Sequence, residues 1–124
     1  MGVLATAKVC TFVGVRDREI AKAFYRDTLG FALKSEDNYG IVFELNNTNL
    51  RLTPLPDFTP QQHTALGWNV ADVPATVKAL VAAGITFERY GFLEQDELGI
   101  WKSGDAQVAW FKDPDGNILS ISSG

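Results

Sequence analysis

Residues Val108 to Ser122 read V-A-W-F-K-D-P-D-G-N-I-L-S-I-S, and this stretch predicts a β-hairpin. Its first arm is rich in β-forming residues, and residues 118–122 of its second arm are again typical of a strand. Between the arms lies Asp113-Pro114-Asp115-Gly116, in which proline fixes φ early in the turn and glycine supplies a positive φ at its end. The chain therefore contains antiparallel sheet.

Upstream of this hairpin one pattern of elements occurs twice, and a helix marks each copy. Asp17 is the expected N-cap of a helix from Arg18 to Leu29, and Gly30 follows as its C-cap. Asp72 and Gly84 bracket the second helix in the same way, with Pro74 in its first turn. The apolar residues expected to face the core are Ile20, Ala23 and Phe24 in the first helix and Val73, Val77, Leu80 and Val81 in the second.

Strands are expected around both helices, because short β-forming runs alternate with turn residues. In the first copy they cover residues 8–15, 31–35, 41–45 and 49–53, with a turn at Asn46-Asn47-Thr48. In the second copy they cover residues 63–70 and 85–90, followed by a loop at 91–99 and the hairpin.

The resulting fold class is α+β, with two tandem β-α-β-β-β modules in one domain, residues 1–124. The modules cover about residues 8–54 and 63–122, and a proline-rich linker at about 55–62 joins them. Two copies are too few for a solenoid, so we expect curved mixed sheets that face each other across a cleft.

The composition excludes several classes of protein. The net charge is −4 with no block of like charges, which argues against nucleic acid or an anionic membrane surface as partner. No apolar run is long enough to cross a membrane, and no signal peptide is expected. Cys10 is the only cysteine, so it has no partner for an internal disulfide. A cytoplasmic location is the expectation.

Four motifs make the sequence resemble the vicinal oxygen chelate superfamily, which groups glyoxalase I, bleomycin-resistance proteins and extradiol dioxygenases. The motifs are Val15-Arg16-Asp17, Ala23 to Phe31, Val70 to Val73 with Ala83-Gly84-Ile85, and Phe111 to Asn117. They follow one another over nearly the whole chain. They cap helices and form turns, so they predict the fold rather than the chemistry.

The resemblance also implies where metal ligands would lie in a metal-dependent member, namely on the first and last strands of each module. Those positions usually hold His, Gln or Glu. Here the matching residues are Cys10, Arg51, Ala65 and Ser120. Alanine cannot ligate a metal ion, and arginine carries a permanent positive charge. The expectation is therefore a protein with no metal and no other cofactor.

Candidate ligand contacts follow from which residues share a strand face with the expected cleft. Phe12 and Trp101 would supply apolar contact, and the polar contacts would come from Cys10, Arg51, Thr53, His63 and Ser120. Each has a structural alternative. Arg51 could pair with a buried carboxylate such as Glu44, and His63 could serve only as a hydrogen-bonded residue at the start of its strand. Cys10 could be a small buried apolar residue.

The favoured function is metal-independent binding of a small organic molecule, such as an antibiotic or an anionic metabolite, similar to the bleomycin-resistance type. The alternative is a metal-dependent lyase, isomerase or dioxygenase whose displaced divalent metal is held by His63 with Glu94 or Glu97. A third possibility is a metal-independent enzyme in which Arg51 stabilises an enolate. The resemblance further implies a homodimer.

Overall fold

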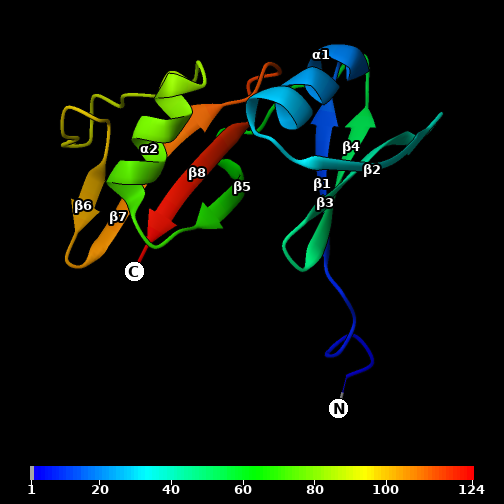
Figure 1. Ribbon diagram of the computed structural model, residues 1–124, viewed down its shortest axis with the longest axis horizontal. Coiled ribbons are helices and arrows are strands. Elements are labelled where there is room, and N and C mark those ends of the chain that lie inside the picture. Colours follow the sequence, from blue (N-terminus) through cyan, green and yellow to red (C-terminus); the bar gives the residue numbers. More distant parts are fainter. Residues whose placement is uncertain (1) are drawn as a thin grey trace. The chain divides into compact units, whose positions relative to one another are not determined.

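The computed structural model describes residues 2–124, and the chain divides into two compact units, the first ending at Phe58 and the second beginning at Thr59. Each unit contains one four-stranded mixed sheet and few helices (Figure 1). The predicted α+β class and the two-module arrangement are thereby confirmed. The cleft between the modules stays a prediction, and each unit is described by itself.

The first unit has the strand order β1-β4-β3-β2. Its strands are β1 (Cys10–Val15), β2 (Ala32–Asp37), β3 (Gly40–Leu45) and β4 (Thr48–Pro54). β1 runs parallel to β4, whereas the β2–β3 and β3–β4 pairs are antiparallel. The β3–β4 turn contains Asn47 at φ 65°, a left-handed conformation that asparagine tolerates.

A short helix, α1 (Arg18–Ala23), continues directly into a π-helical turn, η1 (Phe24–Thr28). The carboxylate of Asp17 accepts hydrogen bonds from the backbone N–H groups of Glu19 and Ile20, as expected of an N-cap. Gly30 follows the helical segment at φ 78°. Both predicted ends of the segment are therefore confirmed.

The predicted inner face of the first helix was wrong for Ile20 and Ala23, whereas Phe24 is half-buried. The buried residues are Ala21 and Tyr25, whereas Ile20 is 55% exposed and Ala23 is also exposed. The ring of Tyr25 packs against Phe31 and Phe43, with ring centroids 6.4 and 6.2 Å apart. Ala21 and Tyr25 are four residues apart, as expected for one face of a helix, so the buried face lies one residue beyond the predicted one.

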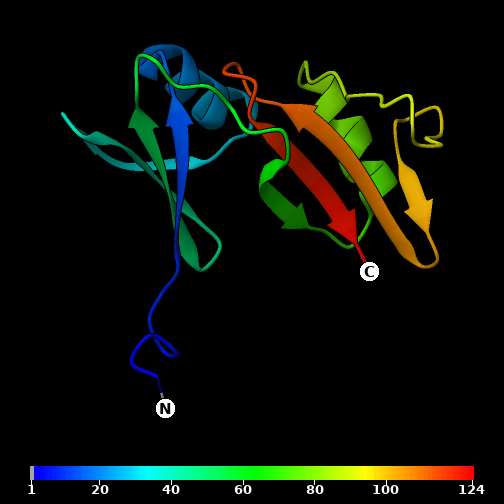
Figure 2. The same cartoon turned by 180° about the vertical axis from the view of Figure 1, so that it is seen from behind.

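The second unit has the strand order β5-β8-β7-β6, with β5 parallel to β8. Its elements are β5 (Thr64–Asn69), α2 (Val73–Ala82), β6 (Trp101–Ser103), β7 (Ala106–Lys112) and β8 (Ile118–Ser123). Asp72 caps α2 by accepting a hydrogen bond from the N–H of Ala75. Views from opposite sides show α2 covering one face of this sheet and leaving the other face bare (Figures 1 and 2).

In the second unit burial alternates along the end of β7, whereas three consecutive residues of β8, Leu119 to Ile121, are buried. Val73 and Val77 of α2 are buried, as are Ala109 and Phe111 of β7. Trp68 stacks on Phe111, with ring centroids 6.5 Å apart, which agrees with its prediction as a core residue. Val81 is exposed, so its predicted place in the core was wrong.

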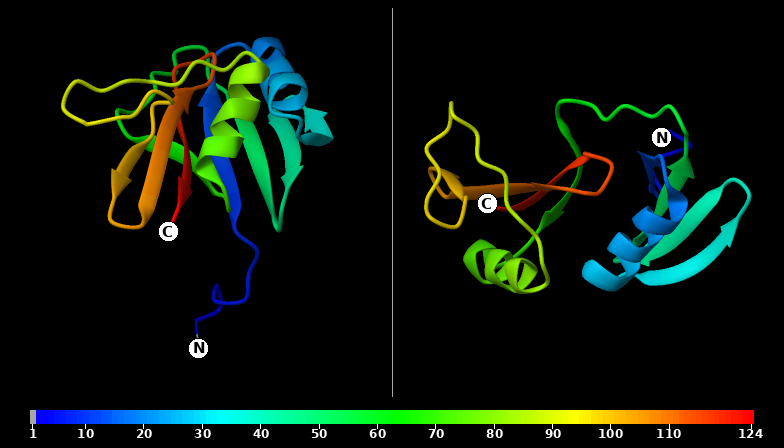
Figure 3. Two further views of the ribbon diagram at one scale, coloured as in Figure 1. Left: turned by 60° about the vertical axis from the view of Figure 1, so that its left-hand side comes forward. Right: turned by 90° about the horizontal axis from the view of Figure 1, so that it is seen from above.

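The predicted strand at residues 85–90 was also wrong, and the strand β6 was not predicted. Two separate pieces of chain occupy the position beside β7. Phe87 forms an isolated bridge with Phe111, and Trp101 pairs with Val108 further along. Between these pieces the chain leaves the sheet over residues 89–100, which we call the excursion (yellow in Figure 3). The edge of the sheet is therefore interrupted: it consists of two short pieces of chain, one before the excursion and one after it.

The closing hairpin is formed as predicted, and a buried network stabilises its turn. The Asp113 carboxylate accepts hydrogen bonds from the N–H groups of Asp115 and Asn117 and from the Asn117 side-chain amide, all at 2.8–2.9 Å. Asp113, Asp115 and Asn117 are buried, and Gly116 adopts φ 89°. These contacts fix where β8 begins, and hence which of its side chains lie on the bare face of the sheet.

Candidate functional site

The bare face of the second sheet carries the side chains that alternate with its buried residues. Because Ala109 and Phe111 of β7 are buried beneath α2, Trp110 and Lys112 lie on the opposite face. Trp110 is the strand partner of Ser120, and Lys112 is the partner of Ile118. The β7–β8 register therefore places an indole, an ammonium and a hydroxyl on one face.

A pocket of about 500 Å³ opens beside this face within the second unit. Tyrosine, phenylalanine and tryptophan rings form part of its wall, and the excursion, β6 and β7 supply them. Its lining residues are Gln62, His63, Thr64, Tyr90, Phe92, Leu93, Trp101, Trp110, Lys112 and Ile118. We call it the aromatic pocket.

Four aromatic rings of this pocket form a continuous series. Tyr90 lies 5.8 Å from Phe92 and meets Trp110 edge to face at 5.6 Å, measured between ring centroids. Trp110 in turn lies 6.3 Å from Trp101. These separations are those of interacting aromatic pairs, so the rings support one another's orientation. The wall is therefore an ordered aromatic surface.

The polar groups of the aromatic pocket are few. His63 Nδ1 lies 3.1 Å from the carbonyl oxygen of Thr64, and since a carbonyl only accepts, Nδ1 carries the proton in this bond. Nε2 is then the ring nitrogen left for a ligand. Lys112 Nζ lies 3.7 Å from the carboxylate of Glu88. Burial, and secondly the charge of Glu88, raise the pKa of Tyr90, so its hydroxyl keeps its proton at neutral pH.

Gln95 is one of the side chains that hold the excursion, which carries part of the wall. Its amide Nε2 donates to the carbonyls of Glu88 and Gly99 at 3.0 and 2.7 Å, and its Oε1 accepts from the N–H of Tyr90 at 2.7 Å. Arg89 donates to the carbonyl oxygens of residues 96 and 97. The segment is therefore braced internally although it lies outside the sheet.

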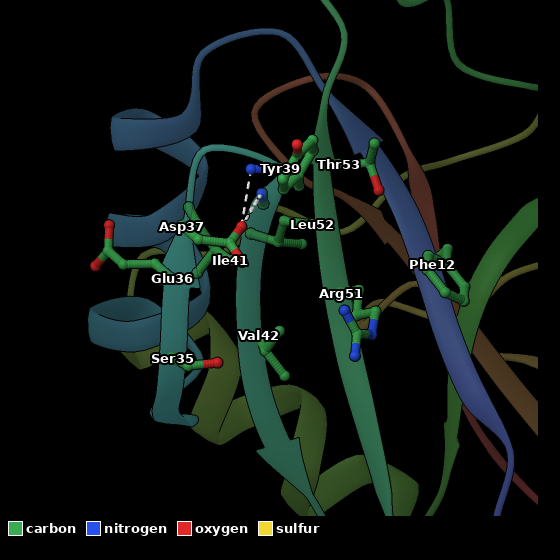
Figure 4. A pocket seen from close by; sticks show the side chains of 11 residues that line it. Phe12, Ser35, Glu36, Asp37, Tyr39, Ile41, Val42, Arg51, Leu52 and Thr53 are labelled. Carbon is green, nitrogen blue, oxygen red and sulfur yellow. Dashed lines mark hydrogen bonds between the residues drawn. The ribbon is translucent and has the colours of Figure 1, made fainter.

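A smaller pocket, of about 260 Å³, lies on the first unit. Strand pairing places Phe12, Arg51 and Val42 in one row across β1, β4 and β3, on the face opposite the buried residues. Thr53 and Tyr39 line the same pocket (Figure 4). This pocket is more polar than the aromatic pocket, since Glu36 and Asp37 also contribute to it.

Arg51 does not form the ion pair with Glu44 that was offered as its structural alternative. Glu44 is exposed, and no ion pair of Arg51 occurs within residues 2–124. Its guanidinium carbon instead lies 5.9 Å from the centroid of the Phe12 ring, a cation–π distance, and Phe12 is 65% exposed. The guanidinium thus faces the pocket without a carboxylate partner in the described part of the chain.

The predicted ligand contacts divide between the two pockets. Phe12, Arg51 and Thr53 line the smaller one, and His63 and Trp101 line the aromatic one. Cys10 is exposed and lines neither, so its reading as a buried apolar residue was wrong. Ser120 is 9% exposed and lies against Gly67, where an added Cβ would come within 2.5 Å of its Oγ.

Several aromatic-pocket residues were not predicted. Lys112 could have been found, because strand alternation places it with Trp110 on the face of Ser120. Tyr90, Phe92 and Leu93 belong to the excursion, where no periodic pattern indicates which way a side chain points.

The residues at the family's metal positions do not fit a divalent cation. Arg51 brings a positive charge to one of them, and Ala65 offers no donor atom. Nowhere in residues 2–124 do three or more His, Cys, Asp or Glu side chains gather as a metal ion would require. His63 therefore has no such group with Glu94 or Glu97 in the described chain.

Comparison with known proteins identifies the family. Residues 8–121 match the family profile described as Glyoxalase/Bleomycin resistance protein/Dioxygenase superfamily. The chain therefore belongs to this superfamily, as the sequence motifs indicated. No functionally curated protein matches the sequence. Across residues 2–124, no helix has both the length and the apolar character needed to cross a membrane.

Solved structures with the same fold include proteins of different activities. A glyoxalase family protein from Bacillus anthracis is 18% identical, with 100% of this chain and 99% of that chain covered and a TM-score of 0.76. TnmS3, an antibiotic binding protein from Streptomyces sp. CB03234, is 24% identical, with 99% and 98% covered and a TM-score of 0.72. Lactoylglutathione lyase from Agrobacterium tumefaciens is 18% identical, with 96% and 94% covered and a TM-score of 0.70. At these identities the likeness shows the fold alone.

Proposed function

We propose that the protein binds a small organic molecule, an antibiotic or an anionic metabolite, without a metal ion. The observation that carries this proposal is the aromatic pocket. Its volume of about 500 Å³ and its mostly apolar wall with a few polar groups match the general pattern of small-molecule sites. The likeness to the antibiotic binding protein TnmS3 supports the same reading at the level of the fold.

The smaller pocket is proposed as a second contact region for ligand. Arg51 would bind an anionic or carbonyl group there, and Phe12 and Thr53 would provide apolar and hydroxyl contact. Ser120 and Cys10 remain proposed contacts on their strands. A guanidinium with no carboxylate partner among the described residues is available for such a role.

Tryptophan fluorescence tests the binding function, because Trp101 and Trp110 line the aromatic pocket and Trp68 lies on the helix-covered side of its sheet. A Trp68→Phe variant removes emission from outside the pocket. Titration of this variant with a panel of planar and anionic compounds is expected to give saturable quenching. Trp101→Ala is expected to weaken the best response about tenfold, since a buried aromatic contact contributes strongly to affinity.

Two different results would contradict the proposed binding function. Quenching without saturation across the panel would refute the binding proposal. Turnover of a methylglyoxal–glutathione adduct by the purified protein would instead favour the alternative, a lyase of the glyoxalase type. A control with Trp68→Phe alone should retain the affinity of the wild type, because Trp68 stacks on the buried ring of Phe111.

We further propose a homodimer and a cytoplasmic location. The dimer rests on the family, whose members often form one, and sedimentation velocity at several protein concentrations tests it. The location rests on Cys10 being the only cysteine of the chain.

A further inference from the structure

We propose that the aromatic pocket selects a flat aromatic carboxylate, with Lys112 as the group that binds its charge. This inference rests on the proposed binding function, and it specifies the class of ligand. Three features of the pocket carry it: the sign of its charge, the availability of the Lys112 ammonium and the arrangement of its rings.

The charge of the pocket is opposite to that of the chain. The whole sequence holds 15 acidic and 11 basic residues, and yet the residues lining this pocket include Lys112 and His63 and no aspartate or glutamate. Aromatic walls can also hold cations against their π-faces. Such a site would be opposed here by the ammonium of Lys112, because like charges repel in a partly enclosed site. The charge therefore favours an anion.

The ammonium of Lys112 is only weakly engaged by the protein. Its partner Glu88 lies 3.7 Å away, which is longer than a hydrogen bond, and the two side chains are 47% and 32% exposed. Exposed ion pairs of this kind contribute little to stability. Lys112 can therefore donate to a ligand at small cost, and a ligand carboxylate would compete with Glu88 for the same donor.

The position of Lys112 on β7 brings its ammonium next to the aromatic rings of the pocket. Lys112 follows Trp110 by two residues on β7, so both side chains leave the same face of the sheet. Trp110 lies between Trp101 and Tyr90 in the series of rings. A flat ring system lying against these indoles would hold a carboxylate on its edge toward Lys112. His63 Nε2 and the protonated hydroxyl of Tyr90 add hydrogen-bonding groups at the same wall.

Matched probes separate charge from shape. The probes are 2-naphthoate, 2-naphthamide and (2-naphthylmethyl)trimethylammonium, which share one flat ring system and differ in charge. Isothermal titration calorimetry of the full chain is expected to rank naphthoate tightest, about tenfold tighter than the amide, because a charge-assisted bond to Lys112 is lost in the amide. The ammonium probe is expected to bind most weakly.

Three variants test the role of Lys112. Lys112→Gln is expected to lower naphthoate affinity to that of the amide and to leave amide binding unchanged. Glu88→Gln removes the competing carboxylate and is expected to tighten naphthoate about two- to threefold, again without effect on the amide. Lys78→Gln is the matched control, because Lys78 is an exposed lysine of α2 that does not line this pocket.

The possible results distinguish two failures. If the three probes bind with similar affinity, or the ammonium probe binds tightest, the inferred ligand class is overturned and the binding function stands. The inferred ligand class is also overturned if the Lys112→Gln variant still binds naphthoate more tightly than the amide. If no probe gives a saturable signal, the proposed function fails for this pocket, and the inferred ligand class fails with it. Since Glu88→Gln is expected to gain affinity, misfolding cannot imitate its result.

Discussion

At the scale of single residues, Asp113 does more than mark a family motif. Its carboxylate accepts three hydrogen bonds within the closing turn, from Asp115 and from both the backbone and the side chain of Asn117. The residue is 4% exposed, so water cannot replace these bonds if the carboxylate is lost. The turn motif is therefore explained by its internal hydrogen bonding.

Replacing Asp113 should reveal this network. Asp113→Ala is expected to lower the free energy of unfolding by about 2–4 kcal/mol, because it leaves buried donors without partners. Asp113→Asn should cost less, about 1–2 kcal/mol, since its oxygen can still accept the two backbone bonds while its amide meets the Asn117 amide. Urea denaturation measures both. Equal losses in the two variants would contradict this account.

Single residues also show what sequence alone can predict of the site. Alternation placed Phe12 and Arg51 on the cleft-facing sides of their two strands, and the structure brings them into cation–π contact because the strands are neighbours. His63 and Trp101 were both predicted as contacts of one cleft, and both line the aromatic pocket of the second unit. Their proximity depends on strand order and on the path of the excursion, and neither follows from local spacing.

At the scale of elements, periodicity predicted most of the strands and erred at two places. Burial in the first helix falls on Ala21 and Tyr25, one residue beyond the predicted face, and the interrupted edge replaces the strand predicted at residues 85–90. The second error has a physical reason: side-chain direction follows from sequence spacing only while the backbone keeps its repeat, and the chain leaves the sheet at the excursion. The excursion supplies part of the aromatic wall, so the irregular element is also the one that shapes the site.

Gln95 offers a test of how the excursion shapes that wall. Gln95→Ala removes three hydrogen bonds and is expected to weaken naphthoate binding several-fold, because Tyr90 and its neighbours lose their fixed position. The free energy of unfolding should fall by only about 1–3 kcal/mol, since the sheet itself is unchanged.

Hydrogen exchange locates the effect of Gln95→Ala. Faster exchange is expected within residues 89–100, with the amides of β7 and β8 unaffected. Gln61→Ala is the control, because Gln61 is exposed and has no side-chain hydrogen bond within residues 2–124. Unchanged exchange across the excursion would show that Gln95 does not hold it.

At the scale of the whole molecule, the two units repeat one strand order, β1-β4-β3-β2 and β5-β8-β7-β6, each with one parallel and two antiparallel pairs. This repeat was predictable, because the caps Asp17 and Asp72 and the glycines Gly30 and Gly84 recur at matching places. The order of strands within each sheet was not, since local patterns do not specify which strands pair.

Metal removal tests the proposal for the molecule as a whole. Prolonged dialysis against EDTA is expected to leave both naphthoate affinity and melting temperature unchanged, because the family's metal positions hold Cys10, Arg51, Ala65 and Ser120. Elemental analysis of protein purified without chelator should find no stoichiometric divalent ion. Loss of binding after EDTA, restored by one divalent ion, would contradict metal-independent binding and support the metal-dependent alternative.

The interrupted edge of the second sheet has a consequence for how this protein can change. Both of its pieces pair with β7, one through Phe87 and the other through Trp101, so the strand register is set on either side of the excursion. Lengthening a loop between fixed ends costs little conformational entropy. The part of the excursion before the buried Ile100 can therefore be exchanged for a segment of another length or composition while the sheet is retained. Grafting there is a route by which evolution or engineering could give the same scaffold a new specificity.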